Sequence, residues 1–152
     1  MTKTVFVLVA LAGAVAAAQP PVLTPAQTLE RRGIGELELS PDGTRVVFTV
    51  TEPVKGAARQ RNIWLLDLAS QQVRQLTFSA KSDSSPRWAP DGRDIAFLSD
   101  RDGAAQLYLL PMRGGESQRL TDRREKVDAF RWSPDGRQIA LLMAEPKPEA
   151  LQ

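Results

Sequence analysis

The stretch RWAPDGRDIAFLSDRD, residues 87–102, decides the fold because its pattern occurs three times in the chain. The upstream copy reads LELSPDGTRVVFTV at residues 37–50, and the downstream copy reads RWSPDGRQIALLM at residues 131–143. A pattern that returns at a regular period is the signature of a repeat protein. The repeat period is therefore more informative here than the overall composition.

Each copy is centred on a Pro-Asp-Gly turn, at residues 41–43, 90–92 and 134–136. Proline presets the φ angle of the second turn position, aspartate accepts a hydrogen bond from the backbone further on, and glycine adopts the left-handed conformation that closes a bulged hairpin. Each turn is predicted to join two antiparallel strands. The strands predicted before the turns are residues 36–39, 86–88 and 129–132, and those after them are 45–50, 94–99 and 138–143. The later strands are nearly continuous apolar runs, which need cover on both faces.

The spacing of the copies gives the length of the repeat unit. The turn aspartates Asp42, Asp91 and Asp135 are 49 and 44 residues apart. Residues 63–77 match residues 107–121 in length, and Leu-Thr ends both segments, so the five extra residues of the first unit lie within 51–62. Each unit then holds four strands in roughly 40 to 50 residues, which is typical of a β-propeller blade.

The predicted fold is all-β, a partial β-propeller of about two and a half four-stranded antiparallel blades over residues 36–152. The first blade is predicted at about 36–77, the second at about 86–121 and the start of a third at about 129–143. The linking stretches 78–85 and 122–128 are polar, and residues 144–152 have a loop composition. Because a closed ring needs about four to eight blades, we expect this chain to be the N-terminal portion of a larger protein.

Residues 1–18 are predicted to be a secretory signal peptide, with Lys3, an apolar stretch at 5–15 and Ala16-Ala17-Ala18 as the cleavage site. The apolar stretch is shorter than the roughly 20 residues of a membrane span, so we expect a periplasmic or secreted protein without a membrane anchor. The chain has no cysteine, which excludes a lipid anchor on cysteine and disulfide bonds. Residues 19–35 are predicted to be a leader with a short helix at 25–32, which Thr24 caps and Gly33 stops.

The charge pattern argues against nucleic acid as a partner. The formal net charge is +2, and it falls to +1 when Lys3 is removed with the signal peptide. The Arg31-Arg32 and Arg123-Arg124 pairs are isolated rather than part of a basic patch, so we interpret them as solvated surface.

The chain also resembles a known family. The resemblance covers the whole chain after the signal peptide and is most specific at LTPAQ (23–27), SSPRWAPDGRDIAFLSDRDG (84–103) and QLYLLPMRGGESQRLT (106–121). These segments are similar to the propellers of secreted prolyl oligopeptidase family serine peptidases, especially the acylaminoacyl-peptidase and dipeptidyl-peptidase-like branch. The resemblance implies an N-terminal propeller over a C-terminal α/β-hydrolase domain with a Ser-Asp-His triad. The propeller of such an enzyme restricts entry, so that peptides reach the serine.

No catalytic residue is predicted within this chain. It contains no histidine, so a Ser-His-Asp triad does not form here. The segment Gly115-Glu116-Ser117-Gln118-Arg119 has arginine in place of the second glycine of a nucleophile elbow, and its context indicates a hairpin turn. The 152 residues alone are therefore predicted to be inactive.

Other candidate binding residues have structural interpretations. Asp100, Asp102 and Gly103 lack the further acidic positions of a calcium loop and indicate a polar hairpin loop. Trp88 and Trp132 occupy equivalent repeat positions, which favours packing between blades over ligand stacking, and the same holds for Trp64, which matches Tyr108. No cofactor or metal is predicted.

The resemblance to the dipeptidyl branch implies that glutamates of the propeller can hold the amino terminus of a substrate. Glu36, Glu38 and Glu52 do not match that motif, so the resemblance assigns no site residue.

Three functions remain open. The first is the gating propeller of an exported serine peptidase that hydrolyses peptides through residues downstream. The second is a non-catalytic periplasmic propeller similar to TolB, although that family places an α/β domain ahead of its propeller, where this chain has only residues 19–35. The third is a small binding protein, acting alone or as a ring of several copies, whose open sheet edges would favour aggregation.

Overall fold

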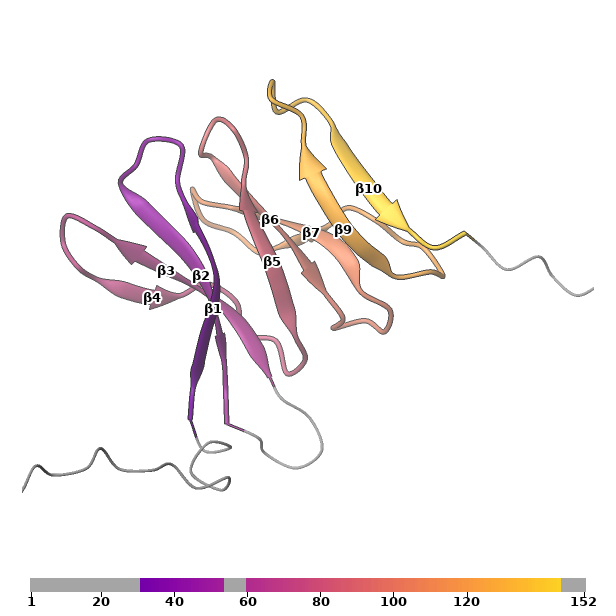
Figure 1. The fold of residues 1–152 in the computed structure, drawn as a ribbon, viewed down its shortest axis with the longest axis horizontal. Helices are drawn as coiled ribbons and strands as arrows, with labels where there is room; N and C mark the ends of the chain where they lie inside the picture. The colour runs from indigo at the N-terminus through magenta and orange to yellow at the C-terminus, as the bar shows by residue number, and fades with distance from the viewer. Residues whose placement is uncertain (1–30, 54–59, 146–152) are drawn as a thin grey trace, which may run out of the picture.

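The structure is a computed structural model that describes residues 31–53 and 60–145 of the 152-residue chain. Every regular element in these two ranges is a β-strand, and the strands form two four-stranded sheets and one two-stranded sheet. Figure 1 shows the three sheets side by side, in chain order from left to right. The prediction of an all-β partial propeller with four-stranded blades is confirmed.

Each blade is a simple antiparallel meander. Blade 1 contains β1 (Gly33–Leu39), β2 (Arg45–Thr51), β3 (Arg61–Asp67) and β4 (Val73–Gln75). Blade 2 contains β5 (Asp83–Trp88), β6 (Asp94–Ser99), β7 (Gln106–Pro111) and β8 (Gln118–Arg119). Blade 3 contains β9 (Val127–Trp132) and β10 (Ile139–Met143). In every sheet, strands that are consecutive in the chain pair with each other.

The three Pro-Asp-Gly turns have the geometry that their residue types predict. Gly43, Gly92 and Gly136 have φ angles of 71°, 70° and 69°, in the left-handed region that favours glycine. The Oδ1 atom of each turn aspartate accepts a hydrogen bond from the backbone N–H two residues later, at 3.1, 3.0 and 3.0 Å. The turn chemistry alone therefore determines where each blade folds back on itself.

Asp42 gives a direct test of this turn chemistry. Hydrogen bonds from the Ser40 hydroxyl and then from the Thr44 N–H and hydroxyl lower the pKa of Asp42 from 3.8 to about 2. Because the pKa is lower in the folded chain, the ionised carboxylate stabilises the fold above pH 3.8, and this contribution is lost as the pH falls through about 2. We expect Ser40→Ala to raise the pKa of Asp42 toward 3.8, measured by NMR titration of its carboxyl carbon. Ser70→Ala, which removes a hydrogen bond to Asp67, is the control that leaves Asp42 unchanged. An unchanged pKa of Asp42 in Ser40→Ala would contradict the expectation.

The innermost strands begin earlier than the sequence predicts. β1 begins at Gly33 instead of residue 36, β5 at Asp83 instead of 86, and β9 at Val127 instead of 129. The pairing of β1 with β2 and that of β5 with β6 are each interrupted by a bulge. Glu36 and Ser85, at equivalent positions of the two bulges, have φ angles of 45° and 52°. Each strand continues on the far side of the bulge, whereas the prediction was based on the few residues next to the turn.

The fourth strands end before the Leu-Thr pairs that were predicted to close them. The Thr77 hydroxyl oxygen accepts a hydrogen bond from the Ile63 N–H at 3.0 Å, and that of Thr121 accepts one from the Leu107 N–H at 2.9 Å. In both blades a threonine side chain thus accepts the hydrogen bond that a backbone carbonyl would otherwise accept, at the end of the ladder between the third and fourth strands. This role explains why Leu-Thr occurs at the same repeat position.

Several predictions fall outside the described residues. The predicted signal peptide at 1–18 lies outside the described residues, and so do residues 25–30 of the helix predicted at 25–32. The last two residues of that prediction, Arg31 and Arg32, are not helical. Of the predicted loop at 144–152, residues 144 and 145 are described and lie outside the strands.

Apolar side chains fill both junctions between blades. Between blades 1 and 2, the buried cluster consists of Val47, Ile63, Leu65, Trp88, Ile95, Phe97, Tyr108 and Leu110. Between blades 2 and 3, it consists of Ala96, Leu98, Leu107, Val127 and Phe130. The β6 strand contributes alternate residues to both clusters, so its apolar run is covered on both faces, as predicted.

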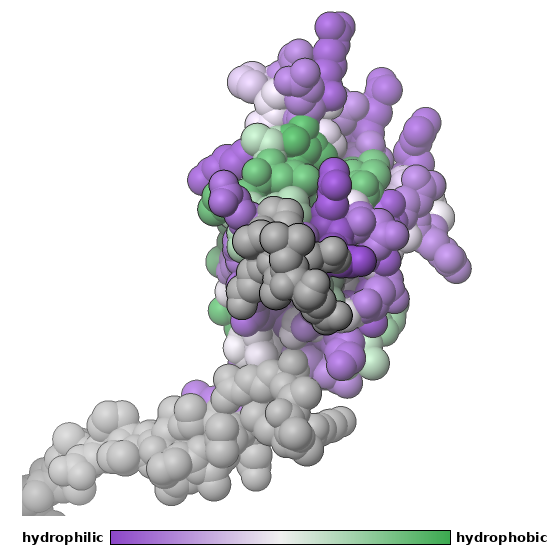
Figure 2. All heavy atoms as spheres, turned by 90° about the vertical axis from the view of Figure 1, so that its right-hand side faces the viewer, coloured by the Kyte–Doolittle hydropathy of each residue, from purple (hydrophilic) through white to green (hydrophobic). Residues whose placement is uncertain are grey.

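The cover predicted on both faces of the apolar run at 138–143 is not found in blade 3 within the described residues. Leu142 in β10 is 63% exposed, whereas Leu98, at the same position in β6, is 5% exposed. Figure 2 views the molecule from the blade 3 side and shows hydrophobic side chains gathered on this face within a hydrophilic border. The reason is that β10 has the apolar residues of a strand that lies between two neighbouring blades, but no further blade packs on it within the described residues.

Candidate functional site

The loop between β6 and β7 is organised around Arg101. Its guanidinium donates to both carboxylate oxygens of Asp83, at 3.2 and 3.3 Å, and to the hydroxyls of Ser99 and Ser117, at 2.9 and 3.0 Å. The Asp83 side chain is fully buried, and that of Arg101 is 28% exposed. Arg101 therefore joins β5 to two loops of the same blade and compensates a buried negative charge. Sequence reasoning missed this role because Asp83 and Arg101 are far apart in the repeat pattern.

Two aromatic rings complete the surroundings of the guanidinium. It lies 4.7 Å from the ring centroid of Tyr108 and 5.5 Å from that of Phe97. The Tyr108 hydroxyl donates a short hydrogen bond to Asp102. Burial, followed by this hydrogen bond, raises the pKa of Tyr108 to about 12, so the tyrosine remains neutral. This arrangement stabilises the loop.

The interpretation of Asp100 and Asp102 as hairpin-loop residues is confirmed. Asp100 Oδ1 accepts a hydrogen bond from the Ser82 N–H at 2.7 Å, and Asp102 accepts from Tyr108. The Gly103 N–H donates to the Asp100 carbonyl at 3.1 Å and closes the turn. Over residues 31–53 and 60–145, no three potential metal-ligating side chains come together.

The hairpin interpretation of Gly115-Glu116-Ser117 is also confirmed. The segment lies between β7 and β8, and Gly114 and Gly115 have φ angles of 106° and 109°. The Ser117 hydroxyl accepts a hydrogen bond from Arg101, and the chain contains no histidine that could activate it. The strand-to-helix turn that a nucleophile elbow requires is therefore not formed at Ser117.

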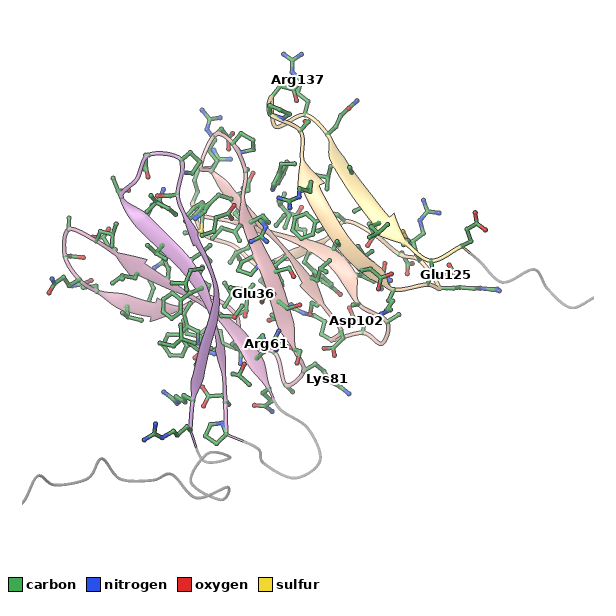
Figure 3. All side chains as sticks on the ribbon, viewed as in Figure 1. Glu36, Arg61, Lys81, Asp102, Glu125 and Arg137 are labelled. Atoms are coloured by element: carbon green, nitrogen blue, oxygen red, sulfur yellow. The ribbon has the colours of Figure 1, made fainter. Side chains whose placement is uncertain are left out.

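The three glutamates make contacts within the chain. Glu36 accepts hydrogen bonds from the Ser85 N–H and hydroxyl, at 3.0 and 3.3 Å, and Glu38 accepts one from the Trp88 N–H at 2.8 Å. Both carboxylates thus reach from β1 to the innermost strand of blade 2. Figure 3 shows Glu36 above Arg61 near β1, and their charged atoms are 3.7 Å apart. Glu52 lies elsewhere and pairs with Arg32 at 2.9 Å.

The tryptophans at equivalent positions pack between blades, as predicted. Trp88 is 5% exposed and belongs to the cluster between blades 1 and 2, and Arg45 lies 4.9 Å from its ring centroid. Trp132 packs against the cluster between blades 2 and 3. Trp64 is half-buried and lies opposite Phe48 in the β2–β3 ladder, as Tyr108 lies opposite Phe97 in blade 2.

A groove lies between blades 1 and 2, where the polypeptide passes from one blade to the next. Its volume is about 640 Å³, and its lining includes Leu76, Phe78, Lys81, Leu110 and Glu116. An adjoining hollow of about 240 Å³ shares Leu76, Phe78 and Leu110 and adds Arg74 and Met112. Sequence reasoning treated residues 78–85 as a polar link and so missed Phe78. The available signal was that Phe78 departs from the repeat, since its counterpart is Asp122.

Comparison with known proteins assigns the family. A family model described as the TolB beta propeller domain matches residues 34–150. The chain belongs to the TolB beta propeller domain family. This match spans both complete blades and the start of the third.

Relatives of this TolB-type propeller include peptidases. It is 38% identical over 84 residues to an uncharacterized peptidase, YuxL, of Bacillus subtilis. This match covers 51% of this chain and 12% of the relative. It is 34% identical over 86 residues to dipeptidyl-peptidase 5 of Porphyromonas gingivalis. This match covers 56% of this chain and 13% of the relative. The chain thus matches only about an eighth of the length of these relatives. The predicted resemblance to peptidase propellers is confirmed.

Solved structures show the same fold. TolB from Acinetobacter baumannii is 34% identical, with a TM-score of 0.60 over 70% of this chain and 26% of that protein. An acylaminoacyl peptidase in complex with Z-Gly-Gly-Phe-chloromethyl ketone is 15% identical, with a TM-score of 0.68 over 82% of this chain and 19% of the peptidase. The described part of this TolB-type propeller forms no helix with the length and apolar character that a membrane crossing requires.

Proposed function

We propose that this chain is part of the propeller of an exported serine peptidase, and that the propeller restricts entry so that peptides reach the catalytic serine. The observation that carries the proposal is the 38% and 34% identity to two peptidases, over 84 and 86 residues respectively. The catalytic residues come from outside these 152 residues, because the chain has no histidine and Ser117 lies in a hairpin. Export follows from the predicted signal peptide at residues 1–18.

The physical basis of gating is the rigidity of the blades. Each junction is closed by apolar side chains, and Glu36 and Glu38 add hydrogen bonds from blade 1 to the innermost strand of blade 2. Junctions of this kind hold the inner strands at fixed separation, so that a channel along them admits an extended peptide and excludes a folded domain. Peptide substrates are the partners that this proposal implies.

The alternative is a non-catalytic periplasmic propeller for protein–protein interaction. It is supported by the family match and by the 34% identity to TolB from Acinetobacter baumannii. The two proposals differ in one respect that is easy to measure, which is hydrolysis.

The test compares the complete gene product with the 152-residue chain. We expect the complete product to hydrolyse acyl-aminoacyl or dipeptidyl p-nitroanilides, to lose this activity with a fluorophosphonate, and to leave folded proteins intact. The 152-residue chain is expected to be inactive and, because apolar side chains on the outer faces of blades 1 and 3 are exposed within the described residues, to form oligomers as its concentration rises. Fluorophosphonate-sensitive hydrolysis by the 152-residue chain would contradict the absence of a catalytic site. A complete product without hydrolase activity would favour the TolB-like alternative.

A further inference from the structure

The exposed hydrophobic side chains of the described residues fall into two groups when each is compared with its counterpart, the residue at the same repeat position in another blade. Leu39 is 54% exposed, whereas its counterpart Trp88 is 5% exposed. Leu142 is 63% exposed, and its counterpart Leu98 is 5% exposed. Most of the exposed hydrophobic residues follow this rule. They lie in blade 1 or blade 3 where no neighbouring strands are present within the described residues, except Leu120, which follows β8 in blade 2 and is next in the chain to blade 3, of which only two strands are described. Residues of this first group are Ile34, Leu37, Leu39, Leu68, Val73, Leu120, Leu141 and Leu142.

Phe78 is the exception. It is 79% exposed, yet it lies at the junction of blades 1 and 2, both of which have all four strands. A missing neighbouring blade therefore does not explain its exposure. Its counterpart in the second repeat is Asp122, so the repeat does not require an aromatic side chain at this position. A single exposed hydrophobic residue carries no argument by itself, but aromatic residues including phenylalanine are enriched at protein interfaces, and the surroundings of Phe78 decide whether it belongs to one.

Phe78 stands beside a groove with an apolar floor. Leu76 and Leu110 line both the 640 Å³ groove and the adjoining 240 Å³ hollow, and Met112 lines the hollow. Leu110 belongs to the buried cluster between blades 1 and 2, and Leu76 and Met112 pack against it. The floor is thus held by the core, which makes the groove a preformed site for an apolar side chain.

Cationic side chains lie on both parts of this groove. Lys81 lines the groove and Arg74 the adjoining hollow, and neither forms an ion pair with a described residue. Figure 3 shows Lys81 pointing away from the sheets. Arg101 also lines the groove but is bound to Asp83, and the acidic residue of the lining is Glu116. The counterparts of Lys81 and Arg74 are Glu125 and Gln118. Like Phe78, these two cationic residues are therefore not shared with the second repeat.

We propose that this groove is a docking site for an extended peptide segment of a partner protein. The segment places an aromatic or large aliphatic side chain against Phe78 and the Leu76–Leu110 floor, and it sets carboxylates against Lys81 and Arg74. The assignment to an acidic segment follows from charge complementarity with two cations that have no partner within the described residues. The site goes beyond the proposed function, because it does not depend on peptidase activity.

The test uses the 15N-labelled 152-residue chain and two synthetic probes. The first is acetyl-Gly-Asp-Phe-Glu-Gly-amide, and the second replaces both acidic residues by lysine. We expect the acidic probe to shift the amide resonances of residues 76–81 and 115–117 in a saturable way and to bind at least about tenfold more tightly than the basic probe, or about 1.4 kcal/mol. The same comparison on the complete gene product, by fluorescence anisotropy of labelled probes, removes any effect of oligomerisation.

The repeat itself supplies the variants. Phe78→Asp and Lys81→Glu introduce the residues that the second repeat carries at 122 and 125, so the fold is expected to tolerate them. Each is expected to weaken binding of the acidic probe by about tenfold. The matched control is Ile34→Asp, which replaces another exposed hydrophobic residue by its counterpart, Asp83, and is expected to leave binding unchanged. Equal binding of both probes, unchanged binding by Phe78→Asp, or shifts confined to the open faces around Leu39 and Leu142 would overturn the proposal.

Discussion

Replacing Arg101 by methionine is expected to lower the free energy of unfolding by about 3 kcal/mol. The Asp83 side chain is fully buried, and Arg101 is the residue that forms an ion pair with it. Without the guanidinium, a charged carboxylate is left in the protein interior with neither water nor a counter-charge. The Ser99 and Ser117 hydroxyls lose a donor at the same time. Urea denaturation of the 152-residue chain measures the change.

Two further variants distinguish the loss of stability caused by breaking the buried ion pair from the effect of removing any arginine. Arg119→Met removes an ion pair with Asp122, whose side chain is 88% exposed, and is expected to change stability little. The double variant Asp83→Leu and Arg101→Met removes both charges and is expected to recover much of the loss, because no unpaired charge remains buried. A single variant Arg101→Met as stable as the parent would show that Asp83 finds another partner.

The elements that sequence predicts well are those determined by neighbouring residues. A Pro-Asp-Gly turn carries its conformation within a few residues, so the turns at Gly43, Gly92 and Gly136 and the blades built on them follow from local chemistry. The bulges were missed because Glu36 and Ser85 adopt positive φ angles without the glycine that signals such a conformation. The carboxylate of Glu36 bonds to Ser85 in the next blade, so the contact is 49 residues away.

The residues of the candidate sites were predicted less well, for the same reason. The sequence correctly indicated that Asp100, Asp102 and Ser117 belong to loops, because turn chemistry is local. It did not indicate the contacts of Arg101 with Asp83 and Ser117, which bring together three segments of blade 2. The role of Phe78 was not predicted for a different reason. A repeat is defined by the positions at which its copies agree, whereas Phe78 is informative because it differs from its counterpart Asp122.

Truncation of Leu98 to alanine is expected to lower the free energy of unfolding by about 3 kcal/mol. Leu98 is 5% exposed and belongs to the cluster between blades 2 and 3, so the substitution removes apolar contacts and leaves a cavity in that junction. The matched control is Leu142→Ala, which makes the same substitution at the same repeat position, where the side chain is 63% exposed. We expect a change of less than about 1 kcal/mol for this control, because most of its surface already contacts water. Urea denaturation of both variants against the parent chain gives the difference.

The same pair of variants tests whether further blades follow in the complete gene product. If another blade packs on β10, Leu142 becomes as buried as Leu98, and Leu142→Ala is then expected to cost about 3 kcal/mol in the complete protein. The control variant of the 152-residue chain thus becomes a destabilising variant of the complete protein. An effect of Leu142→Ala that stays below about 1 kcal/mol in both proteins would mean that this face of β10 remains uncovered. The propeller would then be open at blade 3, and gating by a closed channel would have to be abandoned.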